Sequence, residues 1–325
     1  WLKDLLYFEK KSFESLHNMT IAVAMTSKNK TSSSSDVSSS SALTRCISRE
    51  VEKGNTLLLK VLDDLKLVSA FCDGNARPTN QLRGLVSDLG RGITPLHWKR
   101  SYVTSSISSV SPDAWLNDFI NRMAHVLSLA EPFNSLTSGD NNNHSNNSVV
   151  SVQTIEKLNI WLGGLFHPES FITSSRQHTA EVTGIALDDL IPTLTLITSH
   201  FNQTNDNNKD TLKDEQHDHC FNITGLVLEG SGYDDIKQEL SQKGNHIKTM
   251  VILGKLKWIS RHETNNIKEE KEKGEFNHRI EIPLYLNEGR SVLLTSMELA
   301  RNKEDEKHIF YQRGAALLAW NGAPP

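Results

Sequence analysis

The sequence predicts an α+β protein in which an N-terminal α-helical segment of about five to six helices precedes a small antiparallel β-barrel. Before residue 185, apolar residues recur at the intervals of three and four that are typical of amphipathic helices. After it, short segments rich in β-branched, aromatic and leucine residues alternate with clusters of Gly, Asn, Asp and Lys, which is the spacing of a sandwich or barrel. At 325 residues the chain is long enough for two compact units.

The first 44 residues combine one predicted helix with a polar linker. Apolar residues at near-helical spacing among Lys and Glu predict an amphipathic helix over residues 1–18. Residues 28–41 are rich in Ser, Thr and Lys and have almost nothing apolar to bury, so ordering them would cost entropy without return. We expect a loop there.

A helical hairpin is predicted next. From Leu43 to Phe71 apolar residues recur at intervals of three, four and seven, which predicts one long helix. A second helix over residues 82–89 ends at Gly90-Arg91-Gly92, where glycine can adopt the left-handed conformation of a C-cap.

Two further helices begin at prolines. Ser111, Pro112 and Asp113 form an N-cap, a first helical proline and an acid that suits the helix dipole. Pro168 opens another helix that runs toward Val182. Between these helices, residues 137–148 are an Asn-rich segment of low complexity, for which a long surface loop or disorder is predicted.

The β half contains six predicted strands. They cover residues 190–197, 221–228, 249–256, 279–286, 291–297 and 310–318. The charged or Asn-rich stretches 202–218 and 262–277 are predicted to be insertions in surface loops.

Composition narrows the class of protein. The formal net charge is −4, so no overall positive field is available to bind nucleic acid. The three cysteines, Cys46, Cys72 and Cys220, are widely spaced, which fits a reducing compartment and favours the cytosol. No apolar stretch approaches the ~20 residues of a spanning helix, so no membrane segment is predicted. The start at Trp1 lacks an initiating Met and a signal peptide, and we interpret it as an internal cut.

The motifs of common active sites do not occur. No phosphate-binding loop of the form Gly-x-x-x-x-Gly-Lys-Ser/Thr and no Gly-x-Ser-x-Gly elbow is present. His217-Asp218-His219-Cys220 offers three possible metal ligands, but a partner cluster is missing, so a solvated polar loop is favoured over zinc. The pair Asp188-Asp189 fits a helix start better than acid–base chemistry. The expected catalytic, cofactor and metal residues are therefore none.

Several motifs carry a family resemblance. The segment Ile160-Trp-Leu-Gly-Gly-Leu-Phe-His-Pro-Glu-Ser-Phe-Ile-Thr-Ser-Ser-Arg-Gln177 resembles the C-terminal region of dynein heavy chains. Further matches follow the same order along the sequence, and they are Glu50-Val-Glu-Lys-Gly54, Leu89-Gly-Arg-Gly-Ile-Thr-Pro-Leu-His-Trp98, Trp115-Leu-Asn-Asp-Phe119, Ile223-Thr-Gly-Leu-Val-Leu-Glu-Gly230 and Phe310-Tyr-Gln-Arg-Gly-Ala-Ala-Leu-Leu318. The last of these is more similar to cytoplasmic than to axonemal dynein.

The resemblance implies an architecture and a role. Residues 1–44 would leave the last AAA+ module, residues 45–185 would form a helical subdomain and residues 186–325 a β-barrel subdomain, packed on the AAA+ ring of the same heavy chain. This region would be non-catalytic and would modulate ATP-driven, minus-end-directed motility, while ATP and Mg bind in upstream modules. The implied partners are microtubules and the dynein intermediate, light intermediate and light chains, and the implied location is cytoplasmic and cytoskeletal.

Five residues are candidates for contact with the ring or between subdomains. They are Trp161, Leu165, Phe166, Phe171 and Arg176. The alternative for the four apolar residues is that they fill the core of this region, which is the more frequent role of large apolar side chains. The competing interpretation of the whole sequence is a free-standing cytosolic module whose barrel binds a ligand or peptide.

Overall fold

The computed structural model describes residues 41–102, 110–137, 158–198, 219–242, 248–261, 278–302 and 305–319. The predicted helix over residues 1–18 and the insertions 202–218 and 262–277 lie outside the described residues, as does almost all of the segments 28–41 and 137–148. The protein forms two compact units. In the described residues, a helical unit contains 41–102, 110–137 and Gly164–His167, and a β unit contains the rest.

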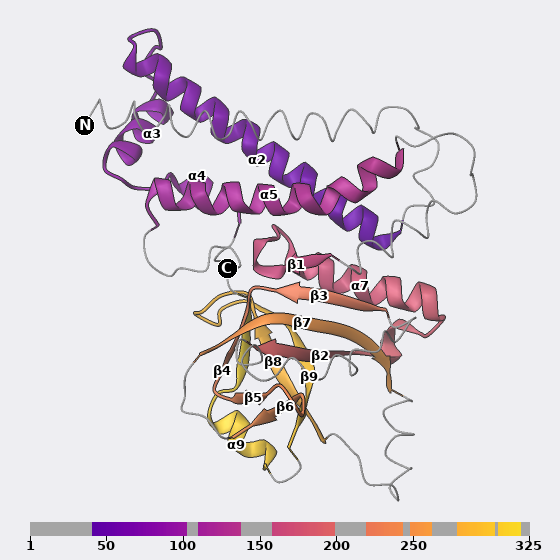
Figure 1. The fold of residues 1–325 in the computed structure, drawn as a ribbon. Helices are drawn as coiled ribbons and strands as arrows, with labels where there is room; N and C mark the ends of the chain where they lie inside the picture. The colour runs from indigo at the N-terminus through magenta and orange to yellow at the C-terminus, as the bar shows by residue number, and fades with distance from the viewer. Residues whose placement is uncertain are drawn as a thin grey trace, which may run out of the picture. The chain divides into compact units, whose positions relative to one another are not determined.

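The helical unit is built on two long helices, α2 (Ala42–Cys72) and α5 (Pro112–Thr137), which cross and pack against each other (Figure 1). In the sequence, α3 (Asn80–Gly90) and the short α4 (Leu96–Lys99) connect α2 to α5. The predicted end of α3 is confirmed, because Gly92 adopts φ +70° while the N–H groups of Gly92 and Ile93 donate to the carbonyls of Leu89 and Asp88. The predicted start of α5 is also confirmed, since the N–H of Ala114 donates to the Ser111 hydroxyl (3.3 Å).

Stacked aromatic rings fill the core of the helical unit. The rings of Trp98 and Trp115 lie 5.3 Å apart, and Tyr102 and Phe119 each stack on Trp115 at 5.5 Å. The short helix α4 is held in place because the indole N–H of Trp98 donates to the carboxylate of Asp64 on α2 (2.8 Å). This hydrogen bond from the indole N–H group fixes the position of the Trp98 ring within the apolar cluster.

The β unit is a six-stranded barrel with additions. It contains β1 (Asn159–Trp161), α7 (Pro168–Thr183), β2 (Leu190–Thr198), β3 (Cys220–Thr224), β4 (Leu226–Glu229), β5 (Gly232–Asp234), β6 (Glu239–Ser241), β7 (Thr249–Ser260), β8 (His278–Tyr285), β9 (Leu293–Arg301), α9 (Lys307–Gln312) and β10 (Ala316–Ala319), with 3₁₀ turns at Leu162–Gly164 and Leu187–Asp189. Around the barrel the order is β2, β7, β4, β10, β8, β9 and back to β2. The α+β fold class is confirmed.

The barrel is mixed, whereas the sequence predicted an antiparallel one. Strand β10 is antiparallel to β4 but parallel to β8, and β2 is parallel to β9. The reason is the order of the strands around the barrel. Strand β10 follows β9 in the sequence, but it lies between β4 and β8 in the barrel. Because β9 is antiparallel to β8 and the chain reverses direction again before β10, β10 runs parallel to β8.

Two predicted strands are interrupted by backbone turns at glycine. The segment 221–228 divides into β3 and β4 at Gly225, which adopts φ +72°. The prediction of a strand over 310–318 was wrong in its first half, where α9 buries Phe310 and ends before Gly314 at φ +66°. A glycine in the left-handed conformation lets the backbone turn, so neither segment continues as one extended strand.

The two compact units divide the protein earlier than the expected boundary at residue 185. Helix α7 groups with the strands, because the ring of Phe171 meets Phe221 of β3 edge to face at 6.0 Å. In addition, the indole N–H of Trp258 on β7 donates to the hydroxyl of Ser175 on α7 (3.0 Å). Helical periodicity does not reveal which core a helix joins. Among the helices that the structure describes, none combines the length and the apolar character that crossing a membrane would require.

Candidate functional site

Two of the five candidate contact residues, Leu165 and Phe166, belong to the helical unit. Both side chains are buried. The Phe166 ring meets Tyr102 edge to face at 5.7 Å, and the carbonyl of Leu165 accepts a hydrogen bond from the guanidinium of Arg122 (3.2 Å). These residues fill the core of the unit, in agreement with the alternative interpretation, and their contact with a ring stays a prediction.

A buried carboxylate holds this segment in place. Glu50 on α2 is 1% exposed and accepts hydrogen bonds from the backbone N–H groups of Phe166 (2.6 Å) and His167 (2.9 Å). Two charge-assisted bonds to one carboxylate define a rigid anchor for a segment that has no long regular structure of its own. We call Glu50 and its two backbone donors the Glu50 anchor.

The other three candidates, Trp161, Phe171 and Arg176, belong to the β unit. Trp161 and Phe171 are almost completely buried. Arg176 is partly exposed, donates a hydrogen bond to the carbonyl of Leu187 and lies over the ring of Trp258, with 5.8 Å between its Cζ and the ring centroid. The structure therefore distributes the five candidates over two cores, and only Arg176 among them has substantial exposure.

Arg176 lines a groove on the β unit. The groove has a volume of about 530 Å³, and α7, β2, β7, β8 and β9 contribute its walls. Trp258 of β7 and Arg261, which directly follows β7, also line the groove. Glu281 of β8 and Glu298 of β9 add two carboxylates to its lining. Its size falls within the range of ligand pockets, and its lining combines apolar strand residues with charges of both signs.

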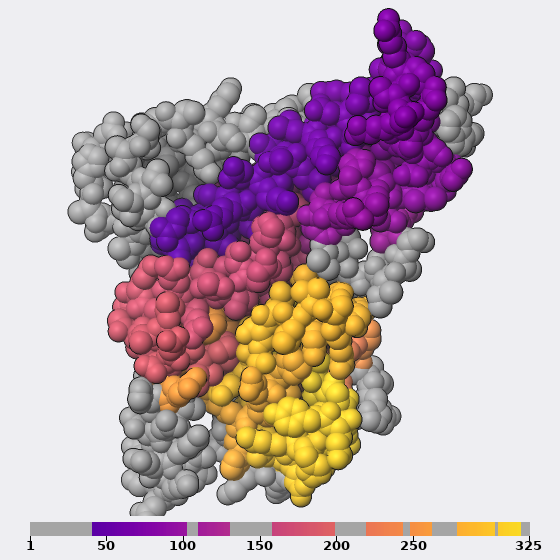
Figure 2. Space-filling model, turned by 180° about the vertical axis from the view of Figure 1, so that it is seen from behind, coloured from indigo at the N-terminus to yellow at the C-terminus, as the bar shows by residue number. Residues whose placement is uncertain are grey.

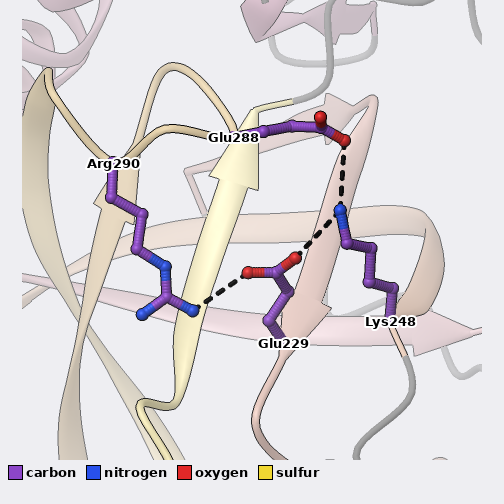
Figure 3. Close-up of polar contacts among 4 residues, drawn as sticks. All are labelled: Glu229, Lys248, Glu288 and Arg290. Carbon is purple, nitrogen blue, oxygen red and sulfur yellow. Dashed lines mark hydrogen bonds and ion pairs between the residues drawn. The ribbon is translucent and has the colours of Figure 1, made fainter. Parts of the chain in front are cut away.

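A second polar feature is a series of four alternating charges, formed by Glu229, Lys248, Glu288 and Arg290 (Figure 3). Arg290 contacts Glu229 at 2.9 Å, Glu229 contacts Lys248 at 3.2 Å, and Lys248 contacts Glu288 at 3.1 Å. Because Glu288 and Arg290 lie in the turn between β8 and β9, the cluster ties this turn to the end of β4 and the start of β7. We call it the charged clamp.

Electrostatics inside the clamp favour its ionised form. Burial raises the pKa of Glu229, but hydrogen bonds from Arg290 and Lys248 outweigh burial and hold the pKa below its ordinary value. Hydrogen bonds to Glu288 and Glu229 raise the pKa of Lys248 above its ordinary value. The turn itself is ordered by Asn287, whose side-chain oxygen accepts the N–H of Ser291 (3.0 Å). In Figure 2 the residues from β8 to β10, coloured gold to yellow, form one continuous surface of the β unit.

The remaining sequence candidates fall in separate places. Asp188 and Asp189 lie in a 3₁₀ turn before β2, as a helix start predicts. His217 lies outside the described residues, while His219 precedes β3 and faces His178 of α7 with ring centroids 6.1 Å apart. In the described part of the protein, no group of three or more His, Cys, Asp or Glu side chains is placed to hold a metal ion.

Sequence reasoning missed the Glu50 anchor, the charged clamp and the groove. Their residues lie far apart in the sequence, since Phe166 follows Glu50 by 116 positions and Arg290 follows Glu229 by 61. The one available signal was that Glu50 and Phe166 each lie in a motif that carries the family resemblance.

Comparisons with known proteins identify the family. Residues 9–319 match the family model for the C-terminal domain of dynein heavy chains. The sequence is 30% identical over 276 residues to "Dynein heavy chain, cytoplasmic" of Drosophila melanogaster, a match that covers 85% of this protein and 5% of that one. It is 28% identical over 284 residues to the protein of the same name from Dictyostelium discoideum (86% and 5%). It is 24% identical over 274 residues to "Cytoplasmic dynein 2 heavy chain 1" of Tripneustes gratilla (84% and 5%). The sequence thus spans about 5% of the length of these curated relatives.

Proposed function

The protein belongs to the family of C-terminal domains of dynein heavy chains, and from this premise we propose that it is the regulatory and structural C-terminal region of a cytoplasmic dynein heavy chain. It packs on the AAA+ ring of the same heavy chain and modulates ATP-driven, minus-end-directed movement along microtubules. The observation that carries this proposal is the family match over residues 9–319, supported by three relatives whose names all identify dynein heavy chains.

In this proposal the region is non-catalytic. ATP and Mg bind in AAA+ modules elsewhere in the heavy chain. The complete motor binds microtubules and assembles with the intermediate, light intermediate and light chains. The names of the relatives support a cytoplasmic, cytoskeletal location. They also favour this interpretation over a free-standing binding module.

The physical mechanism is a difference in contact energy. A domain that packs on a ring shifts the ring between conformations only if its contacts are stronger in one conformation than in the other. A difference of about 1.4 kcal/mol changes the ratio of the two conformations tenfold. Rigid packing within each unit, such as the Glu50 anchor and the barrel with its charged clamp, keeps that difference from being lost to local deformation.

The test compares the complete motor with a motor that lacks residues 45–325. Run length, stall force and ATPase rate are measured for both, and a motor carrying the surface substitution Glu52→Gln serves as the control. The expected result is altered run length or stall force with hydrolysis retained. A complete loss of hydrolysis would support the structural role and contradict pure modulation, and unchanged motility and force would refute the proposal.

A further inference from the structure

The hairpin of β5 and β6 ends in a loop, residues 235–238, that exposes an isoleucine (Figure 1). Ile236 is 84% exposed, the highest value among the large apolar side chains that the structure describes. Turns of this kind usually carry Gly, Asn, Asp or Ser, and an isoleucine side chain offers the turn no hydrogen bond. The conformation of the loop therefore gives no reason for a large apolar residue at this position.

Hydrogen bonds on both sides of Ile236 hold the loop in one conformation. One oxygen of the Asp234 carboxylate accepts the backbone N–H groups of Ile236 (3.0 Å) and Lys237 (3.2 Å). The Asp235 carboxylate accepts the backbone N–H (2.8 Å) and the hydroxyl (2.6 Å) of Thr198, the last residue of β2. These bonds fix the loop to itself and to the barrel, so Ile236 is exposed on a rigid support.

The same end of the barrel carries two more exposed apolar side chains. Thr198 lies opposite Val251 of β7 in the register, and Met250 and Ile252 flank Val251. Val251 is buried, whereas Met250 is 37% and Ile252 48% exposed, because successive side chains of a strand point to opposite faces. One exposed apolar residue is ordinary on a protein surface, but here exposed apolar residues lie on both sides of the end of β2.

The loop is well suited to dock on another surface. Burying an exposed isoleucine favours association by roughly tenfold to a hundredfold. A rigid loop keeps most of this gain, because it loses little conformational entropy when it docks. The sequence spans about 5% of the length of its curated relatives, so a heavy chain has extensive surfaces outside this region.

We propose that the loop 235–238 inserts Ile236 into an apolar pocket on an AAA+ module of the same heavy chain, with Met250 and Ile252 at the margin of the contact. The inference rests on the proposed packing on the ring, and it names one surface through which that packing occurs. The partner surface is concave and apolar, because isoleucine makes no polar contact. The strength of this contact depends on the shape of the pocket, so it differs between ring conformations that open and close the pocket.

The test measures whether the loop is covered in the complete motor, with Lys237 as a native reporter beside Ile236. Lys237 and Lys307 of α9 are both exposed in the structure. Limited labelling of amines, followed by mass spectrometry, gives their relative rates of modification. Docking that is favoured tenfold leaves the loop uncovered about a tenth of the time, so Lys237 should react about tenfold or more slowly than Lys307. Equal rates would overturn the proposal.

The substitution Ile236→Asn separates docking from folding. Asparagine suits a turn and keeps the backbone hydrogen bonds, so the melting temperature should hold while Lys237 becomes as reactive as Lys307. Leu59→Gln on α2, the matched change at an apolar residue that is 47% exposed, should leave Lys237 slow. If Lys237 stayed slow in the Ile236→Asn motor, the role assigned to Ile236 would be wrong.

Replacement of Ile236 by the photoreactive amino acid p-benzoylphenylalanine identifies what covers the loop. Crosslinks to AAA+ modules of the same heavy chain are expected, and crosslinks only to another subunit would overturn the assignment of the pocket. The motor that lacks residues 45–325 distinguishes this inference from the proposed function. Altered motility of that motor, with equal labelling of Lys237 and Lys307 in the complete one, would contradict the docking loop alone. Unchanged motility would contradict the regulatory role even if Lys237 were protected.

Discussion

The Glu50 anchor permits a worked prediction. Glu50→Gln keeps the size of the side chain and one acceptor oxygen, but it removes the negative charge and presents an amide N–H₂ to one backbone donor. In the native protein the N–H groups of Phe166 and His167 both donate to the carboxylate at 2.6 and 2.9 Å, in a site that is 1% exposed. An unsatisfied buried donor costs ~1–3 kcal/mol, and the surviving bond loses its charge assistance, worth about 1 kcal/mol. The helical unit should therefore lose roughly 2–4 kcal/mol of unfolding free energy.

Urea unfolding followed by hydrogen exchange measures this loss separately for each unit, because peptides from α2 and α5 report on the helical unit alone. Glu52→Gln on the exposed face of the same helix is the matched control and should change the unfolding free energy by less than about 0.5 kcal/mol. The reasoning would be refuted if Glu50→Gln matched this control, or if backbone exchange at Phe166 and His167 stayed as slow as in the unmodified protein.

Three smaller predictions follow from packing and charge. Gly54→Ala should destabilise the helical unit by about 1–3 kcal/mol despite its better helix propensity, because the new Cβ would lie 2.4 Å from Sδ of Met123; thermal unfolding measures it. Gly84→Ala on exposed α3, where nothing lies within 4 Å, should instead stabilise by ~0.5–1 kcal/mol in the same assay. The lowered pKa of Glu229 means that its stabilisation is complete above the pKa of the unfolded state and is lost as pH falls through the folded value. Acid titration of β-unit stability should show this loss, weakened by salt, and Glu229→Gln or Arg290→Gln should remove it.

The helices were predictable because their signals are local. Ser111 and Pro112 define the start of α5, and the apolar period of α2 continues until the stop signal that begins at Asp73. Strand positions were also predictable, because segments rich in β-branched, aromatic and leucine residues formed strands, as in β7 and β8. The failure at 310–318 has a local cause too. Phe310 and Tyr311 favour strands by propensity, but burial of the Phe310 ring and the left-handed turn at Gly314 favour a helical turn.

The candidate site was less predictable because it depends on pairing between distant strands. The opposition of Glu281 and Glu298, and the single bridge from Thr193, follow from barrel register, which periodicity does not determine. Of the five residues selected from the sequence, Arg176 lines the groove, while the four apolar residues are buried. Size and apolar character identify core residues efficiently, and for that reason they are poor guides to a surface that another protein contacts.

In the proposed regulatory role, the domain acts on a motor only through surfaces whose contact energy changes during the motor's cycle. The Glu50 anchor and the charged clamp are internally satisfied, so they stabilise their units without favouring any partner conformation. The regulatory effect that we propose therefore depends on surface residues outside these two clusters, because only contacts that differ in strength between two ring conformations shift the ratio of those conformations.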